Sequence, residues 1–294
     1  MFLLFINNLI DTINKSETLL FADDLKLYIR IKNIEDCQSL QEDLNKIYSW
    51  SVEGGLELNI NKCYVLSYTR KKSLSYFNYT INGTVLSRVT EMRDLGVTFD
   101  SQLNFKTHIR NIVNKAYQMY GFIVRNCRDF NNMTCIRTLY VSYIRSILEY
   151  CSVIWSPHYD IHRYSLEKVQ NKMLRYINYK ETGTYQFHIP KLDILKRYNL
   201  HSLESRRSVA YLLFLHKLIN NNIKDPNLLA LISFHVPNYQ TRNPTTMYVD
   251  TARTNYYFNS PIISMCKLYN QVRDQCDIFN IDLNRFRKLL QEIL

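Results

Sequence analysis

The sequence predicts an α+β fold, in which a mixed segment of strands and helices precedes an all-helical segment. Up to about residue 100, short apolar runs and period-two alternation lie between turn-forming residues, which is typical of half-buried strands. From residue 103 onward, apolar side chains recur every three to four positions, as on the buried face of an amphipathic helix. The 294 residues are enough for one large domain or two ordinary ones.

The first predicted hairpin surrounds the dipeptide Asp23-Asp24. Residues 1–10 are mostly apolar and are expected to form a helix, which a polar break at 15–17 separates from an apolar strand at 19–22. After the two aspartates, apolar and polar side chains alternate through residues 25–30, which predicts a second, half-buried strand. Both aspartates are therefore expected at the turn.

A helix and further strands are predicted next. Residues 35–52 have helical spacing, with Leu40, Leu44 and Ile47 inward, and Gly54-Gly55 ends the helix. The dipeptide Asn82-Gly83 between two β-prone runs is a strong hairpin signal, because both residues tolerate positive φ. Further single strands are predicted at three places: residues 56–59, 64–67 and 94–99.

The remaining periodic segments predict helices. A helix is expected around residues 109–123, and the next is expected to run unbroken over 132–155, where Pro157 stops it. Others are expected at three places: residues 162–178, 200–220 and 263–290. Residues 223–262 contain four of the six prolines and are expected to be irregular.

The composition suggests a polyanionic partner and an intracellular location. Lys and Arg number 37 against 26 Asp and Glu, a net charge of +11, although a merely basic soluble protein fits the charge equally well. The 23 tyrosines favour nucleotide contacts slightly. No cysteine pair has zinc-ligand spacing, so free thiols in a reducing compartment are expected. Without a signal peptide or an apolar run of membrane-spanning length, we expect a nuclear or cytoplasmic protein with no membrane partner.

Asp23 and Asp24 are the candidate catalytic residues. Adjacent carboxylates repel each other unless a cation lies nearby, and Mg²⁺ prefers carboxylate oxygens. Two such ions can stabilise the attacking and leaving oxygens of a phosphoryl transfer. The alternative is that aspartate is simply a good turn residue, which would be the better interpretation of an isolated Asp-Asp dipeptide.

The sequence around this dipeptide resembles the reverse transcriptases of non-LTR (LINE-like) retrotransposons. Leu20-Phe21-Ala22-Asp23-Asp24 resembles the Phe/Tyr-Ala-Asp-Asp signature of their palm domain. Other segments resemble the same family in the same order, and they cover almost the whole chain: 4–9, 55–63, 94–97, 145–150, 155–157, 166–175, 257–260 and 269–270. The ordered set is far more specific than the signature alone.

The resemblance implies an RNA-directed DNA polymerase that uses template RNA, primer DNA and deoxynucleotides, with two Mg²⁺ ions or Mn²⁺ as cofactor. It implies that Asp23 is a direct metal ligand, that Asp24 supports the metals, and that Lys62 lies near the leaving pyrophosphate. Phe21 would lie beside the primer terminus. For Lys62 a solvated lysine is an equally good interpretation, and for Phe21 a buried aromatic is the commoner outcome.

Three basic residues are candidates for contact with nucleic acid. Lys168, Lys172 and Arg175 form a stripe on the face of their helix opposite the apolar one. The resemblance implies that this stripe faces the template or primer backbone, where each neutralised phosphate adds a salt-dependent contribution to affinity. A plain solvated helix face explains the stripe equally well.

The resemblance also implies an organisation into a partial palm with an antiparallel sheet and helices at residues 1–102, a helical thumb at 103–180 and a helical carboxy-terminal extension at 181–294. Asn8 stands where the family commonly has Asp, and the family's upstream catalytic Asp and Pro-Gln-Gly segment are not found in the sequence. We therefore expect these 294 residues alone not to polymerise DNA. The alternatives are a non-catalytic nucleic-acid-binding module and a decayed transposon relic.

Overall fold

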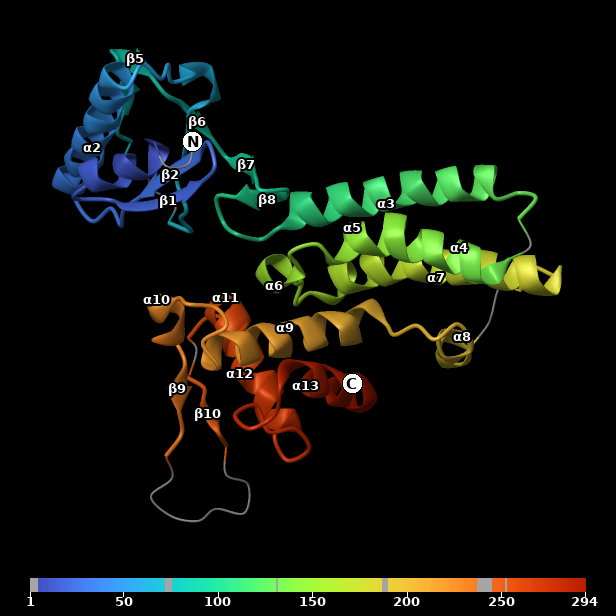
Figure 1. The fold of residues 1–294 in the computed structure, drawn as a ribbon. Helices are drawn as coiled ribbons and strands as arrows, with labels where there is room; N and C mark the ends of the chain where they lie inside the picture. Colours follow the sequence, from blue (N-terminus) through green and yellow to red (C-terminus); the bar gives the residue numbers. More distant parts are fainter. Residues whose placement is uncertain (1–4, 72–75, 131, 187–189, 237–244, 252) are drawn as a thin grey trace. The chain divides into compact units, whose positions relative to one another are not determined.

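The computed structural model describes residues 5–71, 76–130, 132–186, 190–236, 245–251 and 253–294 (Figure 1). The chain divides into two compact units, Met1–Asn104 and Phe105–Leu294. Strands and helices mix in the first unit, whereas helices dominate the second. The predicted α+β class is thereby confirmed at this coarse level.

The first unit begins with a short 3₁₀ helix and a hairpin. Residues 5 and 6 are helical and lead into η1 (Asn7–Thr12), so the helix expected at 1–10 is mainly a 3₁₀ helix; residues 1–4 lie outside the described residues. Strand β1 (Glu17–Phe21) pairs antiparallel with β2 (Asp24–Tyr28). Leucines on the inner face of this hairpin pack against η1 and the following helix.

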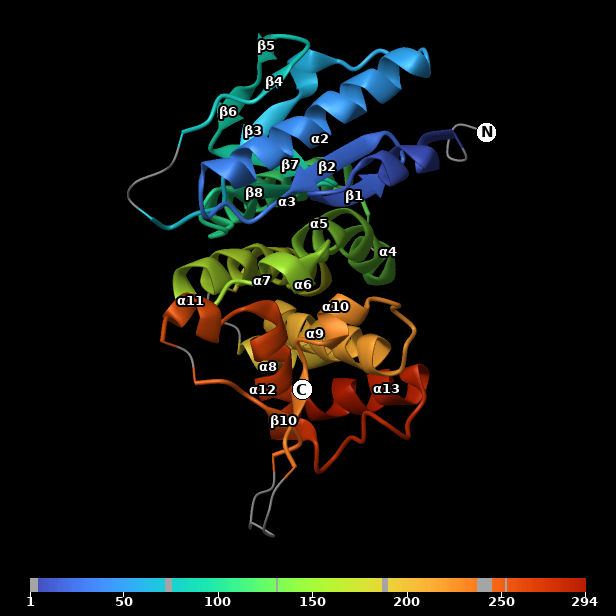
Figure 2. The same ribbon diagram turned by 90° about the vertical axis from the view of Figure 1, so that its left-hand side faces the viewer.

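Helix α2 (Ile34–Glu53) lies beside the hairpin in both views (Figures 1 and 2). Its first turn is closed by a capping box between Asn33 and Asp36, which satisfies free backbone N–H groups. It ends at Gly54, and Gly55 follows with φ 66°, a conformation that glycine adopts without strain. The predicted helix and its glycine terminator are confirmed.

The remaining strands of the first unit are short. They are β3 (Tyr64–Leu66), β4 (Thr80–Ile81), β5 (Thr84–Val85), β6 (Ser87–Val89), β7 (Glu91–Asp94) and β8 (Val97–Asp100). Strands β4 and β5 form the predicted hairpin around Asn82 and Gly83, both of which have positive φ. The described strands of this unit pair two by two, antiparallel as expected except for β3 with β6, which is parallel.

Two strand predictions in this unit were wrong. Residues 56–59 are irregular and precede the 3₁₀ helix η2 (Ile60–Lys62); Leu58 packs against the α2 clusters, which explains its apolar spacing without strand pairing. Residues 94–99 are not one strand, because Asp94 ends β7, Leu95 and Gly96 form a turn, and residues 97–99 belong to β8. Leu95 and Gly96 both take positive φ there, and this reverses the chain.

The second unit begins with helical segments, of which α3 (Lys106–Asn126) and α7 (Asp160–Thr182) are long. Between these two along the chain are α4 (Met133–Leu139), the π-helical segment η3 (Tyr140–Arg145), α5 (Ser146–Glu149) and α6 (Ser152–Trp155). α3 and α7 confirm the predicted helices. The unbroken helix expected at 132–155 was wrong, because it widens to a π-helix and then breaks at Cys151, which has φ 52°. The break buries Trp155, whose indole N–H donates to the Tyr150 carbonyl at 2.7 Å.

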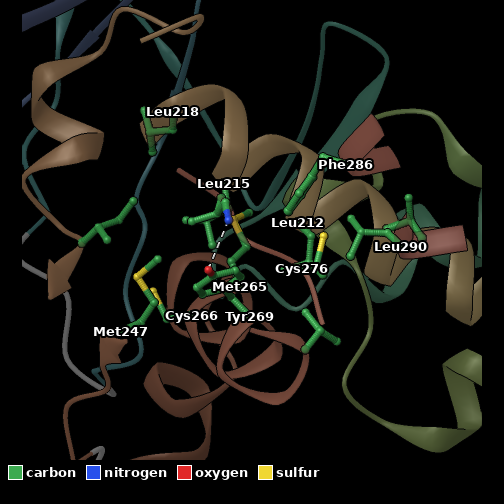
Figure 3. Packing of buried hydrophobic residues seen from close by; sticks show 14 residues of the cluster. Leu212, Leu215, Leu218, Met247, Met265, Cys266, Tyr269, Cys276, Phe286 and Leu290 are labelled. Carbon is green, nitrogen blue, oxygen red and sulfur yellow. Dashed lines mark hydrogen bonds between the residues drawn. The ribbon is translucent and has the colours of Figure 1, made fainter. Parts of the chain in front are cut away.

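The unit ends in a second group of helices around one apolar core (Figure 3). The elements of this part of the chain are α8 (Lys191–Arg197), α9 (Leu203–Ile219), α10 (Pro226–Leu229), β9 (Ser233–Phe234), β10 (Met247–Tyr248), α11 (Asn255–Phe258), α12 (Pro261–Val272) and α13 (Leu283–Ile293). Of these, α9, α10, β10, α12 and α13 contribute side chains to the core. The helix expected at 263–290 is two helices, α12 and α13. The chain between them turns inward to bury Ile278, whose backbone N–H donates to the Tyr269 hydroxyl.

Candidate functional site

The β1–β2 register places the aspartates differently from the prediction. Phe21 pairs with Asp24, so the two residues of the turn are Ala22 and Asp23, and Asp24 opens β2. Ala22 has φ 53°, a left-handed conformation that is costly for a residue with a Cβ. The hairpin is confirmed, but only the first aspartate lies within its turn.

The side chains at this hairpin tip are open to solvent. Phe21 and Asp24 are directly opposite each other and share the outer face of the hairpin, whereas Leu20 and Leu25 face the α2 cluster. Phe21 is 63% exposed, so it is not a buried aromatic. Both aspartates are exposed, and neither carboxylate makes an ion pair or hydrogen bond with any residue that the structure describes. Their carboxylates are thus free to bind a cation.

The two carboxylates supply only part of a metal site. Across the described ranges, no group of three or more His, Cys, Asp or Glu side chains is arranged to hold a metal ion. Mg²⁺ takes six ligands in octahedral geometry, and a pair of such ions needs bridging carboxylates. Asp36 is held in the cap of α2, where one oxygen of its carboxylate accepts the backbone N–H groups of Lys32 and Asn33.

A buried carboxylate fixes the start of the hairpin to α2. The carboxylate of Asp43 accepts the backbone N–H groups of Lys15 at 2.9 Å and Ser16 at 2.8 Å, the Ser16 hydroxyl at 2.9 Å and the Lys46 ammonium at 3.0 Å. Burial raises the pKa of this carboxyl, but the hydrogen bonds outweigh burial and lower its pKa to about 2. Asp43 therefore remains ionised and holds residues 15 and 16 beside the helix.

Neither polar anchor of this hairpin was predicted from the sequence. Asp43 lies three residues after Leu40 and four before Ile47, and an acidic side chain at such an inward position was the available signal. The second anchor is an ion pair between Lys26 of β2 and Asp94 of β7. Nothing in the spacing of these two residues indicated that they pair.

Lys62, the remaining predicted residue of the first unit, ends η2 and is exposed. Among the residues described, it makes no hydrogen bond or ion pair with Asp23, Asp24 or any other side chain. Its position near a leaving pyrophosphate stays a prediction.

The predicted basic stripe lies on α7 in the second unit. Lys168 and Lys172 are exposed, whereas Arg175 is half-buried. The Lys172 ammonium lies 5.3 Å from the ring centre of Tyr117 and 4.9 Å from that of Tyr120, both on α3. These cation–π contacts fix the direction of Lys172. The two tyrosines were not predicted, although their i, i+3 spacing placed them on one side of α3.

The two units differ sharply in charge. Residues 1–104 contain 11 Lys and Arg against 13 Asp and Glu, whereas residues 105–294 contain 26 against 13. Not all of this basic charge is available to a ligand. Arg206 pairs with Glu149 through two nitrogens, and burial lowers the pKa of Arg207. The exposed lysines of α7 are therefore the better candidates for contact with a polyanion.

None of the described helices is both long enough and apolar enough to cross a membrane.

Comparison with known proteins shows which of them have sequences similar to this chain. It is 25% identical over 197 residues to the "Probable RNA-directed DNA polymerase from transposon BS" of Drosophila melanogaster, an alignment that covers 64% of this chain and 21% of the relative. It is 27% identical over 164 residues to the "RNA-directed DNA polymerase from mobile element jockey" of Drosophila funebris, covering 54% of this chain and 18% of the relative.

The chain spans about a fifth of the length of these curated relatives. No protein-family model matches it, and no solved structure does. The resemblance noted in the sequence is nevertheless confirmed by the two relatives, both of which are polymerases of mobile elements. The chain contains a reverse-transcriptase-like region similar to the RNA-directed DNA polymerases of non-LTR retrotransposons.

Proposed function

We propose that this chain takes part in RNA-directed DNA synthesis by a non-LTR retrotransposon polymerase, copying template RNA from a DNA primer with deoxynucleotides. One observation carries the proposal: the aspartate pair of the signature lies at the tip of a hairpin, with both carboxylates exposed and unpaired among the described residues. The similarity to two mobile-element polymerases supports the same reaction.

Four residues of the first unit have proposed roles in this reaction. Asp23 would bind a divalent metal directly, Asp24 would support the same metals, and Phe21 would lie beside the primer terminus. Lys62 would lie near the pyrophosphate. Bound Mg²⁺ or Mn²⁺ would supply charge stabilisation of the attacking and leaving oxygens. The described residues offer two carboxylates, so the other ligands must come from elsewhere, and the chain alone is not expected to extend a primer.

We propose a palm-like role for residues 1–102, a thumb-like role for 103–180 and an extension at 181–294. In this scheme the α7 stripe (Lys168, Lys172 and Arg175) faces the sugar-phosphate backbone of template or primer. Exposure of the two lysines supports it, because neither forms an ion pair with a described carboxylate that a phosphate would first have to replace.

A second candidate function is nucleic-acid binding without catalysis. It is favoured by the charge distribution, because the excess of basic residues lies in residues 105–294, whereas the aspartate pair lies in the other unit. Steeply salt-dependent binding that does not need Asp23 would support this alternative.

A chimera tests the polymerase proposal. This chain would replace the segment of the jockey polymerase with which it aligns, and primer extension on an RNA template would be measured with Mg²⁺. We expect extension by the chimera and a loss of at least about a thousandfold after Asp23→Asn, because a metal ligand is removed. Asp11→Asn is the matched control, since Asp11 is also exposed in the first unit.

Each outcome separates the candidates. Extension that survives Asp23→Asn would contradict the assigned role of the hairpin. An inactive chimera that still binds primer–template with the affinity of the jockey polymerase would favour the binding module. Extension by the isolated chain, abolished by Asp23→Asn, would show that its metal site is complete without further segments.

A further inference from the structure

The exposed face of α7 alternates aromatic and basic side chains along its length. Tyr164, Lys168, Lys172, Arg175 and Tyr179 are separated by four, four, three and four residues, which places them on one side of a helix. From Tyr164 to Tyr179 this row extends about 22 Å. We call these five residues the α7 row.

The tyrosines at the two ends of the α7 row are unusually open. Tyr164 is 66% exposed and Tyr179 is 42% exposed, although both lie on a well-packed helix. Aromatic rings normally contribute most when they are buried, so exposed rings in a row are more informative than single exposed apolar residues. Tyr179 also lies against Tyr185, with ring centres 6.3 Å apart, which extends the aromatic surface.

The charge around the α7 row has one sign. Between Arg163 and Lys180 the only acidic residue of α7 is Glu167, which is buried and accepts the backbone N–H of Glu204. The neighbouring helix α3 contains no Asp or Glu at all. Lys168 makes no ion pair or hydrogen bond with a described residue, so its charge is available. A polyanion would therefore meet no exposed carboxylate of α7 between Tyr164 and Tyr179.

Lys172 is held differently from Lys168. Its ammonium lies over the rings of Tyr117 and Tyr120, which fixes its position without neutralising its charge. The Nε atom of Arg175 is buried and has no hydrogen-bond partner within the part of the chain that is described. The α7 row thus presents one positioned cation, Lys172, and one unpaired cation, Lys168, between exposed rings.

We propose that the α7 row binds an unpaired segment of a nucleic-acid strand, with bases stacked on Tyr164 and Tyr179 and phosphates neutralised by Lys168 and Lys172. This rests on the proposed function, since it takes the basic stripe as the nucleic-acid-binding face. A duplex could satisfy the cations but not the rings, because its bases are already stacked on one another. Unpaired bases offer free faces, and stacking on aromatic side chains contributes to single-strand affinity largely independently of sequence.

Binding of the full chain to two probes tests this inference. The probes are a short oligouridylate and an RNA–DNA hybrid duplex of equal length, each measured over a range of salt concentrations. The test variant is Tyr164→Ala/Tyr179→Ala, and Tyr164→Phe/Tyr179→Phe keeps the rings. The matched control is Tyr248→Ala/Tyr257→Ala, since these tyrosines are similarly exposed, at 50% and 47%, but lie outside α7. Circular dichroism would confirm that every variant folds.

We expect the alanine pair to weaken oligouridylate binding by about ten- to hundredfold with an unchanged salt slope. The phenylalanine pair and the control pair should change the affinity for oligouridylate by less than about threefold. The alanine pair should change the affinity for the hybrid duplex by less than about threefold. Equal loss on both probes, or no loss on either, would overturn the inference. So would a change in sedimentation with unchanged binding, because the rings would then cover a second copy of this chain.

A further variant, Lys168→Gln/Lys172→Gln, separates this inference from the proposed function. Suppose that it weakens the binding of both probes and lowers the slope of log affinity against log salt concentration by about 2, while the tyrosine variant has no effect. The basic stripe is then still the nucleic-acid-binding face, and only the stacking of bases on the tyrosines is contradicted. If the lysine variant leaves both probes unaffected, the stripe is not the nucleic-acid-binding face and both proposals fail.

Discussion

The two compact units of this chain bury their apolar side chains in different ways. The first unit packs short strands and one long helix around small clusters, such as that of Ile6, Leu9 and Ile47. The second packs α9, α12 and α13 around a much larger cluster that includes Leu212 and Phe286. The first carries the aspartate pair and a slight acidic excess, whereas the second carries the basic excess.

The two units also depend on polar anchors to different degrees. Where the apolar clusters are small, precise placement of the hairpin depends on Asp43 and on the Lys26–Asp94 ion pair. Where the core is large, helix positions follow from apolar packing, and the surface is free to carry a row of charges. The proposed chemical and binding roles are therefore supported by different interactions.

Core truncation should affect the second unit most. We expect Leu212→Ala to lower the free energy of unfolding by about 3–5 kcal/mol, because Leu212 is fully buried among buried neighbours. Ile47→Ala should cost less, about 2 kcal/mol, because half-exposed neighbours can close around the space. Hydrogen exchange would measure both, resolved by unit. Equal losses of unfolding free energy in the two variants would contradict the difference in packing. Leu213→Ala, at a half-buried position of the same helix as Leu212, is the control.

Charge reversal should distinguish the contribution of α7 to nucleic-acid binding from that of net charge. We expect Lys168→Glu/Lys172→Glu to weaken binding to an RNA–DNA hybrid about a hundredfold, equivalent to about 2.7 kcal/mol, because two exposed cations become anions. Arg30→Glu/Lys71→Glu applies the same charge change to exposed residues of the first unit and should have an effect below about threefold. Fluorescence anisotropy would measure both, and similar losses would mean that net charge alone governs binding.

The Asp43 anchor should make the first unit sensitive to acid. Its folded-state pKa of about 2 lies below the unfolded value of 3.8, so its contribution is present above pH 4 and is lost as the pH falls towards 2. We expect Asp43→Asn to cost about 2 kcal/mol at neutral pH and to flatten this part of the stability profile, as measured by urea unfolding. Glu42→Gln, which removes an exposed ion pair to Lys15, should leave the profile unchanged.

The smallest expected effect is at the hairpin tip. Ala22→Gly should stabilise the first unit by about 0.5–1 kcal/mol, since glycine adopts a φ of 53° without a Cβ penalty. Ala22→Val should destabilise it, because a β-branched side chain is strained there. The urea concentration at the midpoint of unfolding should therefore be highest for Ala22→Gly and lowest for Ala22→Val. A stabilising Ala22→Val would mean that the turn takes a different conformation.

Much of this fold was predictable where local signals agree. Helices α2, α3 and α7 have clear apolar periodicity, and the Asn82-Gly83 turn has residues suited to positive φ. The breaks at Cys151 and Leu95 were missed because neither residue favours positive φ; tertiary packing, such as the burial of Trp155, imposes that conformation.

The candidate site was predictable in identity but not in geometry. The sequence indicated Asp23, Asp24 and the α7 stripe, because their residue types and spacing are informative by themselves. It did not indicate that Asp23 alone lies within the turn, which depends on strand register. It also missed Tyr117 and Tyr120 beside Lys172, since contacts between separate helices have no local signature.

The π-helical segment η3 has a consequence for how this sequence can change in length. A π-helical turn holds one residue more than an α-helical turn, so Tyr140–Arg145 accommodates an extra residue between α4 and α5. Removing one residue there would restore regular α-helical hydrogen bonding, whereas the same deletion within α7 would rotate every later side chain by about 100°. Length variation among related chains should therefore be tolerated at η3 and excluded from α7.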